Sequence, residues 1–368
     1  MADRIRVGLV GASPQGTSWG ARAHVPALKS LPDYELKAIC TAHEDTARRA
    51  ADVFGAELAF HDYNAMFGHP DIDLVAVAVR VPYHHEITMA ALAAGKNVYC
   101  EWPLGANTKE AAEMTERGEE KGLITMVGLQ ARSDPEVCYL RDLIGQGTIG
   151  DVVACHMTLI GAGSLERTSA RAWQADRTKG ANTMTITGGH NIDALTFCLG
   201  DFAEVSAKVA TQAKELRLSD TGELLAPTSP DNVLVNGVLE SGALASIHIG
   251  SVPYHGSGGW RMDVYGTEGT LVASGGQANY SQQPLRLMLG RGKDALAEIQ
   301  VPDEYRLVPE GTPDGAPYNV AQAYARLADG LRAGESVDPN FATALRLHRL
   351  LDAMVESSDE GRTITVGA

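Results

Sequence analysis

A glycine-rich run near the N-terminus has the composition of a phosphate-binding turn. Residues 5–10 are apolar and are predicted to form a strand, and a helical segment follows the run that contains Gly8, Gly11, Ser13 and Gly16. Glycines at the end of a first strand let the backbone turn tightly and approach a pyrophosphate, which the next helix N-terminus stabilises. The spacing departs from the strict dinucleotide-binding fingerprint, so this interpretation depends on the surrounding elements.

A second candidate position is the abrupt end of an apolar run at residues 97–105. Glu101, Trp102 and Pro103 follow one another there. Proline has no backbone N–H and disfavours a helical residue before it, so residues 98–101 are predicted to form a strand with a fixed exit. Side chains at such an exit are well placed to meet a ligand.

A third candidate is the polar segment 161–183, which contains Arg171 and Trp173 among several basic residues. Its length and polarity suit a loop that binds an acidic or polyhydroxylated ligand. A solvated basic loop explains the same composition equally well.

The elements that position these residues alternate in type along the first part of the chain. Strands are predicted at 5–10, 34–40, 74–79, 97–101 and 124–129, with helices at 44–54, 84–94 and 108–122. Continuous apolar strands that alternate with helices indicate a parallel sheet covered on both faces, with its ligand at the C-terminal ends of the strands. We therefore expect residues 1–130 to form a Rossmann dinucleotide-binding domain.

The pattern changes after residue 130. A helix at 135–144 is followed by predicted strands at 152–159, 233–239, 243–249, 262–264 and 270–272, and Gly266 to Gly269 are predicted to join the last two as a hairpin. Helices at 319–333 and 341–357 close the chain. The expected fold class is α/β, with residues 131–368 forming an α+β domain on an open, predominantly antiparallel sheet. One face of such a sheet can bind substrate or another subunit.

The end of the second predicted strand bears on the choice between NAD and NADP. An NAD site usually has an acid there for the ribose hydroxyls, but residues 41–43 are Thr, Ala and His. The absence of an acid leaves room for a 2′-phosphate, which His43 and Arg48 could neutralise. The sequence therefore slightly favours NADP over NAD, although a surface histidine and a helical arginine are more often merely solvated.

Composition excludes several classes of function. The 368 residues are 44% hydrophobic and carry a formal charge of −15, which suits a small-molecule partner and argues against a nucleic-acid surface. No apolar run is long enough to span a membrane, and the N-terminus lacks the pattern of a signal peptide, so we expect a cytoplasmic protein. The five cysteines are widely spaced and lack metal-ligand spacing, so they are expected to be reduced core thiols, with no metal site.

Several short motifs, in order along almost the whole chain, resemble the Gfo/Idh/MocA oxidoreductase family. They are Gly8-Leu-Val-Gly, Tyr83-His-His-Glu, Ala94-Gly-Lys-Asn-Val, Glu101-Trp-Pro, Gly147-x-Ile-Gly-Asp, Gly189-His-x-x-Asp and Gly266-Thr-Glu-Gly. The runs around Trp19, at Glu101-Trp and at Leu129-Gln-Ala-Arg are most similar to the branch that contains the yeast galactose-pathway repressor. The family fold, a Rossmann domain followed by an open-sheet domain, agrees with the elements predicted above.

The resemblance also shows which expected groups are missing. The family strand exit usually reads Glu-Lys-Pro with the lysine near the reacting carbon, but this chain has Trp102 in that place. An aspartate often stands four residues before the histidine that matches His190, and here that residue is Ile186. His190 and Asp193 remain.

The resemblance implies a catalytic role for His190 and Asp193. Imidazole titrates near neutrality, so His190 is the candidate that takes the proton when hydride moves to a nicotinamide. Asp193 lies three residues further on, on the same helix face, where it could orient the ring or the substrate. A satisfied core histidine and an acid near a helix start are the structural alternatives.

The remaining candidates fall into two groups. Cofactor contacts are expected from Gly8, Gly11, Ser13, Gly16, Trp19, His43, Arg48, Arg80, His84, Glu101, Trp102 and Gln130. Substrate contacts are expected from Trp102, Arg132, Arg171, Trp173 and His190.

Three functions are compatible with these residues. The first is an NAD(P)-dependent oxidoreductase that acts on a sugar, polyol or related hydroxyl compound. The second is a non-catalytic dinucleotide sensor, motivated by Trp102 and Ile186 in place of the usual polar groups. The third is a lyase or glycosidase that recycles its bound NAD. The family resemblance and the open sheet also imply a homo-oligomer.

Overall fold

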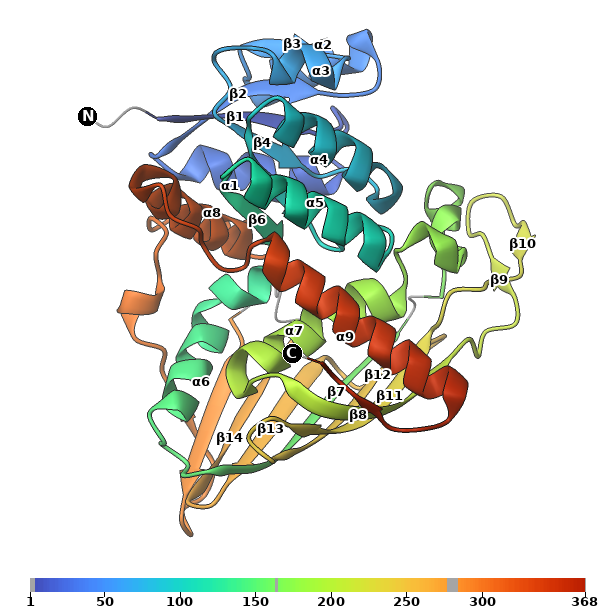
Figure 1. The fold of residues 1–368 in the computed structure, drawn as a ribbon, viewed down its shortest axis with the longest axis vertical. Coiled ribbons are helices and arrows are strands. Elements are labelled where there is room, and N and C mark those ends of the chain that lie inside the picture. The colour runs from blue at the N-terminus through green and yellow to red at the C-terminus, as the bar shows by residue number, and fades with distance from the viewer. Residues whose placement is uncertain (1–3, 163–164, 277–283, 368) are drawn as a thin grey trace. The chain divides into compact units, whose positions relative to one another are not determined.

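The structure, a computed structural model, describes residues 4–162, 165–276 and 284–367. The chain folds into two compact units (Figure 1). The first consists of Met1–Ser133 with Arg306–Arg346, and the second of Asp134–Tyr305 with Leu347–Ala368. A segment from the C-terminal part therefore completes the N-terminal unit. The predicted assignment of residues 1–130 to dinucleotide binding and of residues 131–368 to a second domain stays a prediction.

The first unit is built on a six-stranded sheet in which all neighbouring strands are parallel, as predicted. The strand order is β3-β2-β1-β4-β5-β6. Because the order reverses between β1 and β4, the C-terminal ends of these strands mark the position where doubly wound sheets bind ligands. The strands are β1 (Ile5–Val10), β2 (Tyr34–Cys40), β3 (Leu58–Phe60), β4 (Leu74–Val77), β5 (Asn97–Glu101) and β6 (Thr125–Gly128).

Helices connect these strands, and local side chains fix where several of them begin. Asn107 caps α5 by accepting a hydrogen bond from the Glu110 N–H, and Asp62 caps α3 through the Asn64 N–H. The sequence did not predict β3 and α3, because three and five residues are too few to show a periodicity. The helices are α1 (Val25–Ser30), α2 (Glu44–Phe54), α3 (Tyr63–Phe67), α4 (His84–Ala93), α5 (Thr108–Glu120) and α8 (Ala316–Ala333).

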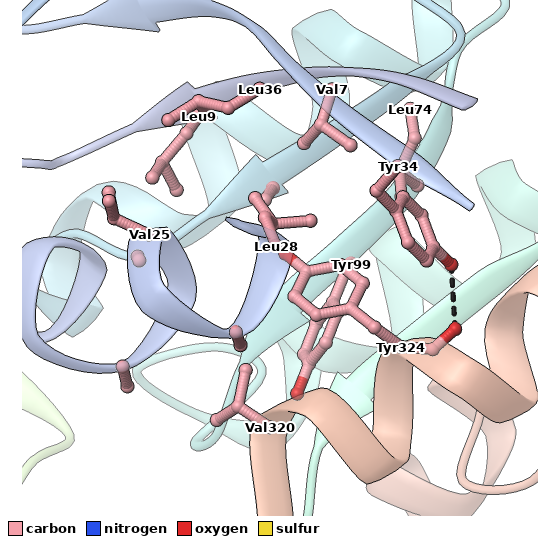
Figure 2. Close-up of a cluster of buried hydrophobic side chains, with 14 of the residues drawn as sticks. Val7, Leu9, Val25, Leu28, Tyr34, Leu36, Leu74, Tyr99, Val320 and Tyr324 are labelled. Carbon is pink, nitrogen blue, oxygen red and sulfur yellow. Dashed lines mark hydrogen bonds between the residues drawn. The ribbon is translucent and has the colours of Figure 1, made fainter. Parts of the chain in front are cut away.

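Three buried tyrosines join the returning helix α8 to the core of the first unit (Figure 2). The ring of Tyr324 lies 4.9 Å from that of Tyr99 and 5.1 Å from that of Tyr34, centroid to centroid. The Tyr34 hydroxyl donates to the Tyr324 carbonyl oxygen over 2.7 Å. The apolar face of α8 is therefore part of the Rossmann core.

The second unit is built on a nine-stranded sheet of order β16-β15-β14-β13-β7-β12-β11-β8-β17. Among the described strands of this sheet, only β7 and β12 pair in parallel, so the predicted predominantly antiparallel sheet is confirmed. The sequence missed β8, because the buried side chains of Phe202 and Val205 are three residues apart and break the alternation. The strands are β7 (Val152–Ala162), β8 (Phe202–Ala210), β11 (Asn232–Leu239), β12 (Leu244–Val252), β13 (Trp260–Gly266), β14 (Gly269–Gly275), β15 (Arg286–Arg291), β16 (Ala297–Ile299) and β17 (Ile364–Thr365).

Helices α6 (Pro135–Gly145), α7 (Gly189–Leu199) and α9 (Phe341–Glu360) lie on one face of this sheet (Figure 1). Hydroxyls of α9 fasten it to β8, since Ser357 Oγ accepts from the Ala207 N–H and Ser358 Oγ from the Val209 N–H. A separate two-stranded ladder consists of β9 (Leu216–Arg217) and β10 (Leu224–Leu225).

The cysteines and the helices bear on two predictions made from the composition. All five cysteines are buried and none forms a disulfide bond among the described residues, as expected for core thiols. No helix within the described ranges is long and apolar enough to cross a membrane.

Candidate functional site

The first position of the turn after β1 has room only for glycine. Gly11 has a φ of +108°, and a Cβ there would lie 2.5 Å from the Ala78 carbonyl oxygen. A Cβ on Gly20 would lie 3.0 Å from the Gly11 carbonyl oxygen. Because both side chains are absent, the end of β1, the residue after β4 and the next helical turn approach one another closely. This is the backbone arrangement that a pyrophosphate requires, so these residues fit a dinucleotide.

The other predicted residues of this segment have different surroundings. Gly8 lies inside β1, where a Cβ would be 3.0 Å from Met66 Sδ, so it serves the packing of α3 on the sheet. Gly16 has a φ of +74° and open space around it. Ser13 and Ser18 exchange hydrogen bonds between N–H and Oγ at 2.9 and 3.4 Å, which closes the turn. Trp19 directly precedes the π-helical segment Gly20–His24.

His43 and Arg48 follow β2 but are not equally available to a ligand. His43 is exposed at the N-terminal boundary of α2. Arg48 is exposed on that helix and forms an ion pair with Glu44 one turn earlier. The positive charge of Arg48, which was expected to neutralise a 2′-phosphate, is therefore already paired with a carboxylate.

Arg80 and His84 lie beyond the end of β4 in different environments. Arg80 is exposed, whereas His84 is buried, with Nδ1 at 2.8 Å from the Pro103 carbonyl oxygen and Nε2 at 3.1 Å from that of Val79. The ring thereby links the exits of β4 and β5. Burial lowers the pKa of His84, and a neutral imidazole donates to only one of these oxygens at a time.

The carboxylate of Glu101 is held inside the first unit. Gln130 Nε2 donates to both carboxylate oxygens, at 2.8 and 3.1 Å, and His24 Nε2 lies 2.8 Å from Oε1. The other ring nitrogen of His24 lies 2.8 Å from the Tyr324 hydroxyl. A Cβ on Gly128 would be only 2.4 Å from Glu101 Oε2, so a glycine makes room for the carboxylate.

Three members of this network were not among the predicted site residues. His24 lay in a helical run without an acid nearby in sequence, and Tyr324 is 300 residues away from it. Gly128 ends a strand and showed no glycine motif. Glu101, Gln130 and the run around Trp19 that contains His24 had a signal only through the family resemblance.

Trp102 and Arg132 lie close to this network in sequence. Trp102 is buried and joined to Pro103 by a cis peptide bond. Arg132 forms an ion pair with Asp338 at 2.8 Å, so its guanidinium already has an anionic partner in the first unit.

His190 lies in the first turn of α7 and Asp193 three residues further along the same helix, and both are buried. The π-helical segment Thr183–Gly188 leads directly into α7, and Asn182 caps it through the N–H groups of Met184 and Thr185. Ile186 lies in this segment, one turn before His190. The two predicted catalytic side chains are therefore placed by one capped, continuous helical run.

The predicted substrate loop contains short 3₁₀ helices. Arg171 and Trp173 lie in Ser169–Ala175, which is followed by Arg177–Lys179. Arg171 Nε donates to Gln174 Oε1 over 3.2 Å. Residues 163 and 164 of this segment are outside the described residues.

The predicted residues are gathered within their own units. The first unit contains the expected cofactor contacts with Trp102 and Arg132, and the second contains His190, Asp193, Arg171 and Trp173. Their roles stay predictions. Among the residues that the structure describes, no group of three or more His, Cys, Asp or Glu side chains could hold a metal ion.

A parallel sheet of this strand order, with a turn after its first strand that requires glycine at position 11, defines a dinucleotide-binding Rossmann domain. Residues 5–129 match the family described as the GFO_IDH_MocA oxidoreductase family with an NAD-binding Rossmann fold. Residues 135–275 match the C-terminal domain of Gal80p. The chain therefore has a Gfo/Idh/MocA NAD-binding domain followed by a Gal80p-like C-terminal domain.

Relatives include both enzymes and a regulator. Dehydrogenase aclE of Aspergillus oryzae is 29% identical over 98% of each chain, and levoglucosan dehydrogenase of Pseudarthrobacter phenanthrenivorans is 27% identical over 73% of each. The galactose/lactose metabolism regulatory protein GAL80 of Saccharomyces cerevisiae is 24% identical over 99% of this chain and 95% of its own.

Solved structures show the same fold. Gal80p of Kluyveromyces lactis has a TM-score of 0.85 at 25% identity, covering 99% of this chain and 92% of that one. Levoglucosan dehydrogenase in complex with NADH and levoglucosan has a TM-score of 0.86 at 23% identity, with both chains covered completely.

Proposed function

We propose that the protein is an NAD(P)-dependent oxidoreductase that transfers a hydride to or from a sugar, polyol or related hydroxyl compound. The observation that carries the proposal is the placement of His190 and Asp193, buried three residues apart on α7, in a chain whose turn after β1 requires glycine at position 11. The similarity over nearly the whole length to a dehydrogenase supports it.

Oxidation of a carbinol requires a hydride acceptor and a base. When bound, NAD(P)⁺ supplies the acceptor for the hydride that leaves the carbon. His190 takes the hydroxyl proton as the C–O bond gains double-bond character, and Asp193 favours the imidazolium so formed and orients the ring. In the reverse direction His190 returns this proton to the alcohol oxygen.

The proposed substrate is polyhydroxylated. Tryptophan faces suit the C–H surfaces of sugars, and both Trp102 and Trp173 are candidates for such contacts. The name of levoglucosan dehydrogenase, a relative at 27% identity, points to the same class of compound. Arg171 adds a positive charge to the substrate side, and Arg132 is a further candidate despite its ion pair with Asp338.

The test is a screen of sugars, polyols and their oxidised forms with each dinucleotide, followed by His190→Ala with the best substrate. Loss of a proton acceptor is expected to lower kcat by roughly 10²–10⁴-fold while the Kd for NADH changes little. His61→Ala, at an exposed histidine of the first unit, is the matched control. Unchanged kcat in His190→Ala would remove this residue from the proposal.

We further propose a slight preference for NADP over NAD. It is supported by the absence of an acid at residues 41–43 and by the exposed His43, while the Arg48–Glu44 ion pair reduces what Arg48 adds. NADPH is expected to bind more tightly than NADH in fluorescence titrations, and His43→Asp is expected to reverse the order. Strong NAD selectivity of the unmodified protein would contradict this preference.

The second candidate function is a non-catalytic dinucleotide sensor. Trp102 and Ile186 stand where the resemblance leads one to expect a lysine and an aspartate, and the similarity to GAL80 covers almost the whole chain. Tight binding of NAD(P) without turnover of any compound in the screen would favour this function. Product formed without net NADH would instead indicate a lyase or glycosidase that recycles its cofactor.

A further inference from the structure

Two arginine side chains of the second unit share one neutral hydrogen-bond acceptor. Arg167 Nη1 donates to Gln174 Oε1 over 2.5 Å, and Arg171 Nε donates to the same oxygen over 3.2 Å. Gln174 is buried, Arg167 is half-buried and Arg171 is exposed. Two positive groups therefore converge on a single buried amide oxygen.

The arginine pair has no anionic partner among the residues that the structure describes. Arg167 Nε is buried without a hydrogen bond. Burial, together with the charge of Arg171, lowers the pKa of Arg167. A desolvated cation without a counter-ion is unfavourable, and the cost is removed when an anion binds.

Two aspartates of the neighbouring segments are engaged elsewhere. Asp220 accepts hydrogen bonds from the N–H and Oγ of Ser169, and Asp176 accepts from the N–H and Oγ of Thr178. These bonds lower the pKa of both carboxyl groups, so each stays charged in its present place. Neither compensates the arginine pair.

The backbone around the pair is held at both ends. The Arg167 carbonyl oxygen accepts from the Ser219 N–H over 2.8 Å. The Gln174 carbonyl oxygen accepts from Ser229 Oγ over 2.7 Å, and that of Ala175 accepts from the Thr228 N–H over 2.9 Å. Bonds from more than 40 residues further along the chain thus fix the loop, so little ordering remains to be done when a ligand binds.

We propose that Arg167 and Arg171 bind the carboxylate of a hydroxy acid, with Gln174 holding the guanidinium groups in position until the ligand replaces its amide oxygen. A planar guanidinium matches a planar carboxylate through two parallel N–H···O bonds. The ligand class is then a sugar acid instead of a neutral sugar. Only the description of this ligand as a substrate rests on the proposed function.

The experiment measures binding, so that it does not depend on turnover. D-gluconate, D-glucitol and inorganic phosphate are titrated separately into the full-length protein, with and without NAD⁺, by calorimetry. Gluconate is expected to bind at least tenfold more tightly than glucitol, and the advantage is expected to shrink as the salt concentration rises. Phosphate is expected to bind more weakly than gluconate.

The variants are Arg171→Gln and Arg167→Lys, with Arg177→Gln as the control because Arg177 is an exposed arginine in the next 3₁₀ helix. Arg171→Gln changes an exposed residue, so it is expected to fold and to lose about tenfold in gluconate affinity with glucitol unaffected. Arg167→Lys keeps the positive charge but loses the planar guanidinium with its two parallel N–H donors. It is therefore also expected to lower the affinity for gluconate.

The outcomes separate this inference from the proposed function. Equal binding of gluconate and glucitol, equal loss in the Arg177 control, or tighter binding of phosphate than gluconate would each overturn the hydroxy-acid site. If the enzyme turned over neutral polyols with no preference for sugar acids, the hydroxy-acid site would be overturned and the proposed oxidoreductase function would stand. Arginine-dependent gluconate binding without any turnover would support it while removing the enzyme proposal.

Discussion

Glu101 shows how much a single carboxylate can be constrained by its neighbours. Two donors from distant segments, Gln130 and His24, hold it, and Gly128 leaves the space that it occupies. A buried carboxylate is tolerated only when such donors satisfy it. The residue therefore contributes to the first unit as an internal anchor, whatever contact it also makes with a cofactor.

The space beside Glu101 can be tested with Gly128→Ala. The new Cβ would lie 2.4 Å from Glu101 Oε2 and 2.6 Å from Cδ, so the carboxylate must move away from its donors. The free energy of unfolding in urea is expected to fall by about 1–3 kcal/mol. Gly145→Ala, which has no atoms within 4 Å of its Cβ, is the control and is expected to change stability by less than about 1 kcal/mol.

At the scale of elements, capped helices and glycine turns fix the positions of the predicted site residues. The run from Thr183 into α7 begins at an asparagine cap and carries both His190 and Asp193. Helix α9 is fastened to β8 through two serine hydroxyls, and its buried face includes His348. The environment of that histidine has a measurable consequence.

Burial lowers the pKa of His348 to about 4. Its ordinary pKa is near 6.5, so between these values the unfolded chain binds the proton more readily than the folded protein does. Stability is therefore expected to be retained above pH 6.5 and lost as the pH falls toward 4, by about 2 kcal/mol between pH 7 and pH 5.

Urea unfolding of the unmodified protein and of His348→Gln at pH 7 and pH 5 isolates this contribution. The variant is expected to lose less stability on acidification than the unmodified protein. Identical pH slopes for the two proteins would show that His348 does not contribute.

At the scale of the whole molecule, the outer face of the second sheet bears on assembly. Leu244, Ala154 and Tyr265 are neighbours across β12, β7 and β13, and Leu244 and Tyr265 are 60% and 42% exposed. Leu234 on β11 is exposed on the same face. Clustered exposed apolar side chains are typical of a surface that another molecule covers.

We predict a homo-oligomer that buries this face. Light scattering is expected to give a mass of at least twice the 39.0 kDa of one chain. Leu244→Glu is expected to shift the mass toward one chain, whereas Val53→Glu, on an exposed apolar residue of α2, is expected not to. A single-chain mass for the unmodified protein at micromolar concentration would contradict the prediction.

Local patterns in the sequence determined most of the fold. Apolar strands such as 5–10 and 74–77, and the helices between them, were predictable because burial on both sides of a parallel sheet leaves a continuous apolar run. Elements too short to show a period, such as β3 and α3, were not. The glycine turn was visible because a positive φ and close backbone approach both demand glycine.

Tertiary structure alone decided which polar groups meet. His24 and Tyr324 are 300 residues apart and still share a hydrogen bond, and Arg167 and Arg171 converge on Gln174 because bonds from residues 219–229 hold their loop. Such contacts depend on how elements pack, and a sequence pattern records only spacing along the chain. For this reason the sequence indicated only a basic loop and a strand exit. The structure decided that the loop contains an arginine pair without an anionic partner among the described residues, and that the strand exit contains a carboxylate held by buried donors.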